Sequence, residues 1–271
     1  MRSRVRWMGA MLLVVVGLAT TMGVATPAGA ARTTAAKTRT ARLSGEITVS
    51  AAASLTEAFT RLGAAFQRAH RGTTVRFNFG ASSVLAAQIQ GGAPADVFAS
   101  ADGANMQKVV ASHLVRSAPA DFAANLLTIV VKKGNPKRVI GLADLANVGI
   151  VAECAVTVPC GKYAAQMLSQ DGVSIPSSRV TLGQDVKATL TAVSTGDADA
   201  GIVYVTDAKS AAASVTQVKI PASLNVLAVY PIASLRSSQN TALAQAWVRY
   251  VLSSTGQKAL AKFGFLPAPA P

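Results

Sequence analysis

Apolar and polar positions alternate along the chain with two periods, one typical of strands and the other typical of helices. Residues 46–52 form a short β-rich run. In the amphipathic segment 55–70, apolar side chains recur at spacings of three and four, which predicts a helix with one buried face. Residues 74–79 alternate apolar and polar positions, the pattern of a strand with one buried face.

The same alternation continues to the end of the chain. Further strands are predicted at 96–100, 126–131, 148–152, 179–182, 200–204, 214–220 and 224–233. Further helices are predicted at 84–90, 103–111, 161–169 and 186–194, and a final helix at 242–251 that continues through 256–263. Alternation of this density predicts an α/β protein with mixed, mostly parallel sheets flanked by helices. No internal repeat and no long linker follows residue 45, which favours two lobes joined by crossing strands over two separate domains.

Residues 1–30 have the layout of a secretory signal peptide. Three arginines among the first six residues precede a long apolar run, and Ala28 and Ala30 form an A-x-A cleavage site. A retained membrane anchor is the alternative, because an apolar run of about 18 residues can span a bilayer. The small residues before Ala30 and the polar stretch after it favour cleavage, so we expect a mature protein outside the cytoplasm.

Residues 31–45 are rich in alanine, threonine and arginine, with no aromatic residue and no apolar period, and we interpret them as a flexible basic leader. Seven of the 26 basic residues precede Glu46, whereas all 12 acidic residues lie from Glu46 onward. The folded part therefore carries an excess of about +7 rather than the +14 of the whole chain. Its basic residues are not interleaved with aromatic ones, which argues against a nucleic-acid partner.

Cys154 and Cys160 are the only two cysteines. In an exported protein, an even pair of cysteines predicts a disulfide. A zinc site needs more ligands than two thiols, and His70 and His113 lie in the other half of the sequence. We therefore expect a structural disulfide and no direct metal ligands.

Ligands of parallel α/β sheets bind beyond the carboxyl ends of the strands, where helix N-termini point. The residues predicted at those ends are Ser54, Ser82, Ser83 and Tyr204, and the segments 158–164 and 182–190 open two helices there. They bring hydroxyls and helix N-termini together without paired carboxylates or a histidine. Because helix N-termini bind anions through free N–H groups, the set predicts a cage of neutral donors for a fully deprotonated tetrahedral oxyanion.

Each of these residues also has a purely structural interpretation. Ser54 and Glu57 form the S-x-x-E pattern of a capping box for the helix at 55–70. Ser82 and Ser83 are ordinary helix openers, and Asp185 is interpreted as the cap of the helix at 186–194. Val186 and Cys160 would then be packing residues, and Tyr204 a buried phenol.

A secreted serine hydrolase is the alternative of a different class. Such an enzyme needs a nucleophile elbow or an equivalent Ser–His pair, but the chain has no G-x-S-x-G and only two histidines. Asp96 has no second acid or histidine placed to assist it, and we interpret it as orienting a loop at a strand start. We expect no enzyme activity.

Five segments resemble, in order, the motif series of the extracytoplasmic molybdate-binding proteins of ABC importers: "AAASLTEAF", "FNFGASSVLAAQIQGGAPADVFASAD", "VPCGKYA", "GQDVKATLTAV" and "GIVYVTDA". The resemblance covers about Ile47 to Phe265. It implies the two-lobed type II periplasmic-binding-protein fold with a ligand cleft between the lobes. From the two places where the chain should cross, we expect one lobe at 46–124 plus 228–271 and the other at 125–227.

The resemblance also implies a ligand set and partners. The oxyanion contacts would be the hydroxyls of Ser54, Ser82 and Tyr204 and the backbone amides of Cys160 and Val186, with Ser83 as the alternative to Ser82. The ligand would be molybdate or tungstate, with sulfate as the alternative guest, and there would be no cofactor. A monomer would deliver the ion to an ABC transporter permease. The chain departs from the pattern in its cysteine at 160 and in having no lipid-attachment cysteine near the signal segment.

Overall fold

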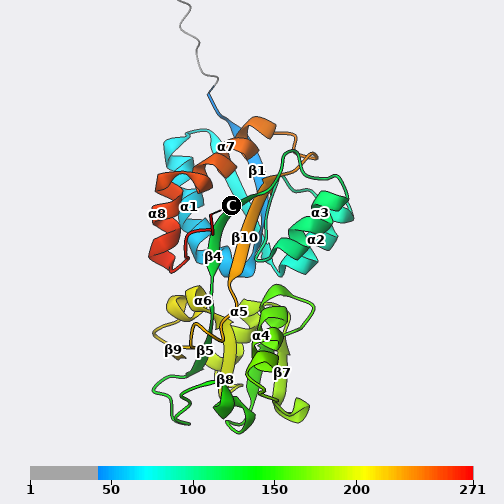
Figure 1. Cartoon of the computed structure of the whole chain (residues 1–271). Coiled ribbons are helices and arrows are strands. Elements are labelled where there is room, and N and C mark those ends of the chain that lie inside the picture. Colours follow the sequence, from blue (N-terminus) through cyan, green and yellow to red (C-terminus); the bar gives the residue numbers. More distant parts are fainter. Residues whose placement is uncertain (1–41, 271) are drawn as a thin grey trace, which may run out of the picture. The chain divides into compact units, whose positions relative to one another are not determined.

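Two five-stranded β-sheets organise the chain in the computed structural model, which describes residues 42–270 (Figure 1). The predicted signal peptide (1–30) and residues 31–41 of the predicted leader lie outside the described residues. Gly45, the last residue of that leader, already belongs to the first strand.

The strands are β1 (Gly45–Ala52), β2 (Thr73–Gly80), β3 (Val97–Ala99), β4 (Ala120–Asn125), β5 (Leu127–Lys132), β6 (Val151–Cys154), β7 (Val180–Gly183), β8 (Ala200–Tyr204), β9 (Val215–Val218) and β10 (Ala228–Ser234). The α-helices are α1 (Thr56–Ala69), α2 (Ser82–Gln90), α3 (Gly103–Ala111), α4 (Pro159–Gln170), α5 (Val186–Ser194), α6 (Val205–Ser210), α7 (Thr241–Leu252) and α8 (Ser254–Phe263). Short 3-10 helices cover Ala53–Leu55, Leu142–Ala146 and Ser177–Arg179.

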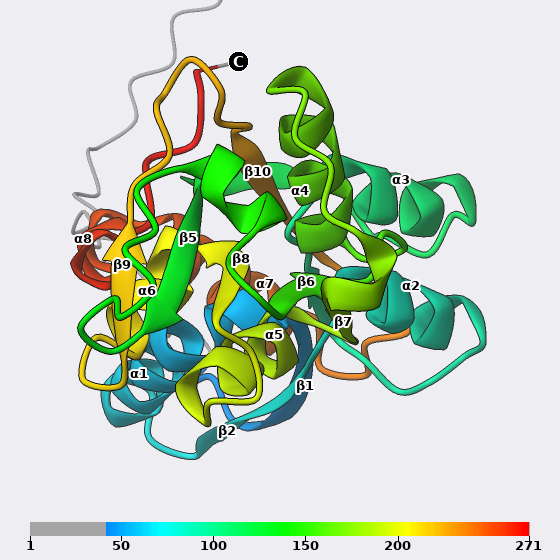
Figure 2. The same ribbon diagram turned by 90° about the horizontal axis from the view of Figure 1, so that it is seen from below.

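The first sheet has the strand order β2-β1-β3-β10-β4, and the second has β7-β6-β8-β5-β9. Figure 2 shows the second sheet from β9 at one edge to β7 at the other. We call the first sheet with α1, α2, α3, α7 and α8 the first lobe, and the second sheet with α4, α5 and α6 the second lobe. Helices α1 and α8 flank the first sheet on one side, and α2 and α3 on the other (Figure 1).

The predicted α/β class and the mixed, helix-flanked sheets are confirmed, but parallel pairings are half of the total rather than the majority. In each sheet four strands run in the same direction, and the fifth pairs antiparallel with both of its neighbours. These reversed strands are β5 and β10, the first strand after each crossing between sheets. A strand that follows a crossing from the other sheet begins at the carboxyl ends of the parallel strands. It therefore runs antiparallel to them.

Most predicted elements are found within a few residues of their expected bounds. The apolar stripe of α1 is buried as expected, with Phe59, Leu62 and Phe66 facing the core. Phe59 and Phe66 both pack edge-on against Trp247 of α7, with ring centroids 5.6 and 5.5 Å apart. Strand β4 and helix α6 were not predicted. The predicted final helix is divided into α7 and α8, because Ser253 has an extended backbone and its side chain caps α8. In the described part of the chain, no helix has the length and apolar character needed to cross a bilayer.

Candidate functional site

A small cavity of about 20 Å³ lies between strand ends and helix starts of the two lobes. Its walls are formed by Ala52, Ala53, Ser54, Gly80, Ala81, Ser82 and Ala101 of the first lobe and by Val158, Pro159, Cys160, Asp185, Val186 and Tyr204 of the second. The structure thus brings together all five residues expected to contact a ligand. Ser83, the alternative to Ser82, is half-buried and does not line the cavity. A space of this size suits a compact guest of a few atoms.

Ser54 lies in the 3-10 turn Ala53–Leu55 that joins β1 to α1, and it is buried. Its Oγ is 2.9 Å from the Oη of Tyr230 on β10. The predicted capping box is wrong: the N-cap residue of α1 is Leu55, with no side-chain cap, and the carboxylate of Glu57 bonds to Lys187 instead. Ser54 lies one residue before the N-cap position, inside the 3-10 turn that precedes α1. Its backbone is therefore not the extended one from which a serine side chain typically caps a helix.

Ser82 is the first residue of α2 and is buried. Its Oγ accepts a hydrogen bond of 2.9 Å from the backbone N–H of Ala101, in the loop after β3. The hydroxyl therefore ties two strand-end loops together rather than capping its own helix, which has no side-chain cap. A hydroxyl that accepts through a lone pair still carries a hydrogen that it can donate.

Two helix N-termini of the second lobe reach the same cavity. Cys160 is the second residue of α4, after Pro159, and Val186 is the first residue of α5. As first-turn residues they have no carbonyl partner for their N–H groups within their own helix. Asp185 caps α5 as predicted, because its Oδ1 accepts from the N–H groups of Lys187 and Ala188, both at 2.9 Å. This cap leaves the N–H of Val186 to other partners.

The predicted disulfide is present and fixes the loop before α4. It joins Cys154, at the end of β6, to Cys160, with Cα atoms 5.8 Å apart. The next residue must be glycine, because a Cβ at Gly161 would collide with the carbonyl oxygens of Cys154 and Ala155. Covalent and steric constraints therefore fix the position of Cys160, which lines the cavity in the first turn of α4.

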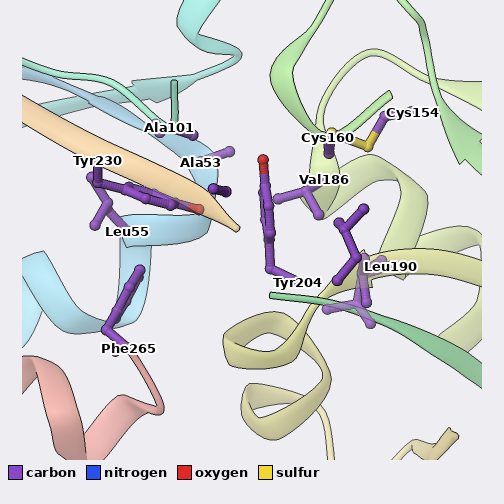
Figure 3. Close-up of a cluster of buried hydrophobic side chains, with 14 of the residues drawn as sticks. Ala53, Leu55, Ala101, Cys154, Cys160, Val186, Leu190, Tyr204, Tyr230 and Phe265 are labelled. Atoms are coloured by element: carbon purple, nitrogen blue, oxygen red, sulfur yellow. A yellow bond between two sulfur atoms is a disulfide. The ribbon is translucent and has the colours of Figure 1, made fainter. Parts of the chain in front are cut away.

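Tyr204 ends β8 and is fully buried between the two lobes. Figure 3 shows its ring between Val186 on one side and Ala53 and Tyr230 on the other. Its Oη has no hydrogen-bond partner among the described residues. Burial, reinforced by the neighbouring Tyr230, raises the pKa of the phenol well above its ordinary value, so the group stays neutral and keeps its proton. A neutral O–H donor without a partner thus belongs to the wall.

Among the described residues, no cationic side chain lines the cavity, and the one charged residue in its wall, Asp185, uses Oδ1 of its carboxylate for the helix cap. The arrangement can therefore hold a small species that accepts several hydrogen bonds. It does not resemble a hydrolytic site, because the partner of Ser54 is a tyrosine rather than a base. The Asp96 carboxylate accepts from the N–H of Thr48 at 2.7 Å, next to β3, as expected of a residue that orients a strand start. The described residues contain no cluster of three or more metal-ligating side chains.

Sequence reasoning missed three features of the site. Tyr230 was expected in a strand but not as the partner of Ser54, and the amide of Ala101 was not expected to bind Ser82. The ion pair of Glu57 and Lys187 was also missed. The only sequence signal for Tyr230 is a phenol within the otherwise apolar run 228–233.

Comparisons with known proteins agree with this geometry. The family model described as bacterial extracellular solute-binding protein matches residues 47–266. The molybdate-binding protein ModA of Mycobacterium tuberculosis is 42% identical over 220 residues, which are 81% of this chain and 84% of the relative.

Two solved structures share the fold. The periplasmic molybdate-binding protein of Azotobacter vinelandii has a TM-score of 0.72 at 21% identity, covering 82% of this chain and all of that chain (100%). The sulfate-binding protein SubI of Mycobacterium tuberculosis has a TM-score of 0.74, also at 21% identity, over 82% of this chain and 86% of that one.

Proposed function

The chain belongs to the family of bacterial extracellular solute-binding proteins, and from that premise we propose that it captures molybdate outside the cytoplasm for an ABC importer. The observation that carries this proposal is the small cavity whose described walls combine neutral hydroxyls and two helix N-termini with no cationic side chain. The relative from Mycobacterium tuberculosis, named a molybdate-binding protein, directs the choice of ion.

In this proposal, five groups hold the ion. The hydroxyls of Ser54 and Ser82 donate from the first lobe, and the Tyr204 hydroxyl and the amides of Cys160 and Val186 donate from the second. We assign Ser82 rather than Ser83 because only Ser82 lines the cavity. A fully deprotonated tetrahedral oxyanion has only acceptors, and the positive ends of α4 and α5 supply the field that a lysine or arginine would otherwise provide.

The mechanism is capture by lobe closure without covalent chemistry, so the protein is not an enzyme. Residues 1–30 direct export and are then removed, leaving residues 31–45 as a leader. The lobes at 46–124 with 228–271 and at 125–227 close around the ion, and the monomer presents it to the permease. Tungstate has the same charge and shape and occupies the same cage.

Sulfate is the second candidate, favoured by the structural likeness to a sulfate-binding protein. Sulfate is also a tetrahedral dianion, but its bonds to oxygen are shorter than those of molybdate. A cage spaced for the larger ion would leave donors out of reach of the smaller one.

Thermal unfolding of the mature protein with molybdate, tungstate, sulfate or phosphate tests the proposal. A ligand that binds only the native state raises the melting temperature, by an amount that grows with its concentration above the dissociation constant. We expect a large shift with molybdate and tungstate and little with phosphate, whose protonated form needs an acceptor in the wall. A shift in melting temperature with sulfate alone would identify sulfate rather than molybdate as the ligand. No shift with any of these oxyanions would refute the proposed function.

A further inference from the structure

A single ammonium group connects the two lobes beside the cavity. Nζ of Lys187, on α5 of the second lobe, lies 2.8 and 2.9 Å from the two carboxylate oxygens of Glu57, on α1 of the first lobe. The same Nζ is 2.9 Å from Oδ1 of Asp207, on α6 of its own lobe. Among the ion pairs of the described residues, only that of Lys187 with Glu57 joins the lobes.

The two acids differ in how they depend on lobe closure. The Asp207 side chain is fully buried in the second lobe, whereas that of Glu57 is 40% exposed and that of Lys187 is 25% exposed. Asp207 and Lys187 move together when the lobes separate, but Glu57 moves with the other lobe. A separation of the lobes would therefore leave Asp207 beside the ammonium and take Glu57 away from it.

The ion pair lies next to the cavity without being part of its wall. Lys187 directly follows Val186, and Glu57 lies in the first turn of the helix that follows Ser54. Neither Lys187 nor Glu57 lines the cavity. Any effect of these two charges on a guest must therefore act through lobe closure or through the electric field.

We propose that Glu57 and Lys187 form a latch that stabilises the closed form and slows release of the bound ion. The latch deepens the proposed function and rests on it. Burial lowers the pKa of Lys187, but attraction by Asp207 and Glu57 outweighs this effect and leaves its pKa raised, so the ammonium is charged throughout the physiological range. A bidentate, charge-assisted contact is stronger than a neutral hydrogen bond.

A simple field effect is the competing explanation, and it predicts the opposite sign for one variant. Through the field alone, removing the negative charge of Glu57 would strengthen the binding of a dianion. Through the latch, Glu57→Gln weakens it. Lys187→Met weakens binding in both cases and also leaves the buried Asp207 without its cation, so Glu57→Gln is the decisive variant.

The first measurement is the dissociation rate of molybdate from the wild type and from Glu57→Gln, followed by stopped-flow fluorescence. We expect dissociation to be faster by about 5-fold, since partly exposed ion pairs contribute modestly. The matched control is Glu46→Gln, which removes an acid of the same lobe that pairs with Arg76 within that lobe. An unchanged or slower rate in Glu57→Gln would overturn the latch.

The second measurement needs no ligand and separates the latch from the proposed function. Spin labels at Arg71→Cys and Ser174→Cys, both exposed and one on each lobe, report the separation of the lobes by electron–electron double resonance. The native cysteines do not interfere because they form the disulfide. We expect Glu57→Gln to shift the ligand-free distribution toward longer distances and Glu46→Gln to leave it unchanged. Identical distributions would refute the latch, whereas a wild type that binds no oxyanion would refute only the proposed function.

Discussion

The two walls of the cavity are built differently. In the first lobe, the hydroxyls of Ser54 and Ser82 are already bonded within the protein, to Tyr230 and to the amide of Ala101. In the second lobe, the Tyr204 hydroxyl has no partner among the described residues, and the first-turn amides of α4 and α5 have none within their helices.

This difference separates two roles. The first-lobe wall keeps its shape through its own hydrogen bonds, so its donors are preorganised. The second-lobe wall contains buried polar groups whose best partner is a guest, and leaving such groups unpaired costs free energy. The second lobe should therefore gain most from binding, and the first lobe should lose most stability when its hydroxyls are removed. The following predictions test this contrast.

The largest expected effect is a pH dependence of stability that originates in the second lobe. Burial raises the pKa of Asp207 to about 6, although Lys187 partly opposes the shift. The pKa of Asp207 is higher in the folded state than in the unfolded state, so the proton bound to its carboxyl group stabilises the folded protein. This stabilisation is fully present below about pH 4 and is lost as the pH rises through 6. The advantage of the wild type over Asp207→Asn should therefore fall by about 3 kcal/mol between pH 4 and pH 7.

Urea unfolding of both proteins at several pH values measures this difference. Asp199→Asn is a control of opposite sign. The Asp199 carboxylate loses some solvation, but its bonds to Lys132 and to the N–H of Ile150 lower its pKa overall, so its contribution to stability is lost as pH falls. If the difference in unfolding free energy between the wild type and Asp207→Asn did not change with pH, the pKa of Asp207 would not be raised in the folded state.

Tyr204→Phe should reduce oxyanion affinity by about 10- to 100-fold, because a hydrogen bond to a charged group contributes about 1.5–3 kcal/mol. Stability without ligand should be unchanged or slightly higher, since the hydroxyl has no partner to lose. Isothermal titration calorimetry and urea unfolding measure the two quantities.

Tyr230→Phe is the matched control from the first lobe. Its hydroxyl bonds to Ser54, so this variant should lose stability and less affinity. If Tyr204→Phe and Tyr230→Phe showed the same pattern, the proposed contrast between the walls would be wrong.

The sequence predicted the residues of the cavity well because strand ends converge. Once the strands at 46–52 and 200–204 are recognised, the geometry of parallel sheets places Ser54 and Tyr204 each at the carboxyl end of a strand, one in each of the two sheets. The cap by Asp185 was also predictable, since capping depends on neighbours in the chain.

What the sequence could not show were contacts between distant segments. Ser54 and Tyr230 are 176 positions apart, and a local S-x-x-E pattern gave the wrong partner for both Ser54 and Glu57. Strand β4, with the sequence ADFAAN, lacks a clear apolar period, and only pairing with β10 makes it a strand. Such pairings depend on register in three dimensions, which no local pattern specifies.

Breaking the disulfide should weaken the second-lobe wall more than the fold. A disulfide that closes a loop this short contributes roughly 2 kcal/mol to the free energy of unfolding by the chain-entropy estimate, so its loss leaves most of the fold intact. Cys154→Ser should retain the far-ultraviolet circular dichroism of the wild type but bind molybdate more weakly, because the amide of Cys160 is no longer fixed. Unchanged affinity in calorimetry, after mass spectrometry has verified the free thiol, would show that helix packing alone positions this amide.

Ser54→Ala should have the smallest effect, about 1 kcal/mol of stability, because the Tyr230 hydroxyl loses its partner. The affinity should fall as well, since the variant has one donor fewer. A double-mutant cycle with Tyr230→Phe identifies the cause: residues in contact give a coupling energy, whereas independent effects add. We expect the double variant to be nearly as stable as either single variant. Strictly additive losses would mean that the Ser54–Tyr230 bond contributes nothing to the first-lobe wall, and the contrast between the walls would then depend on Tyr204 alone.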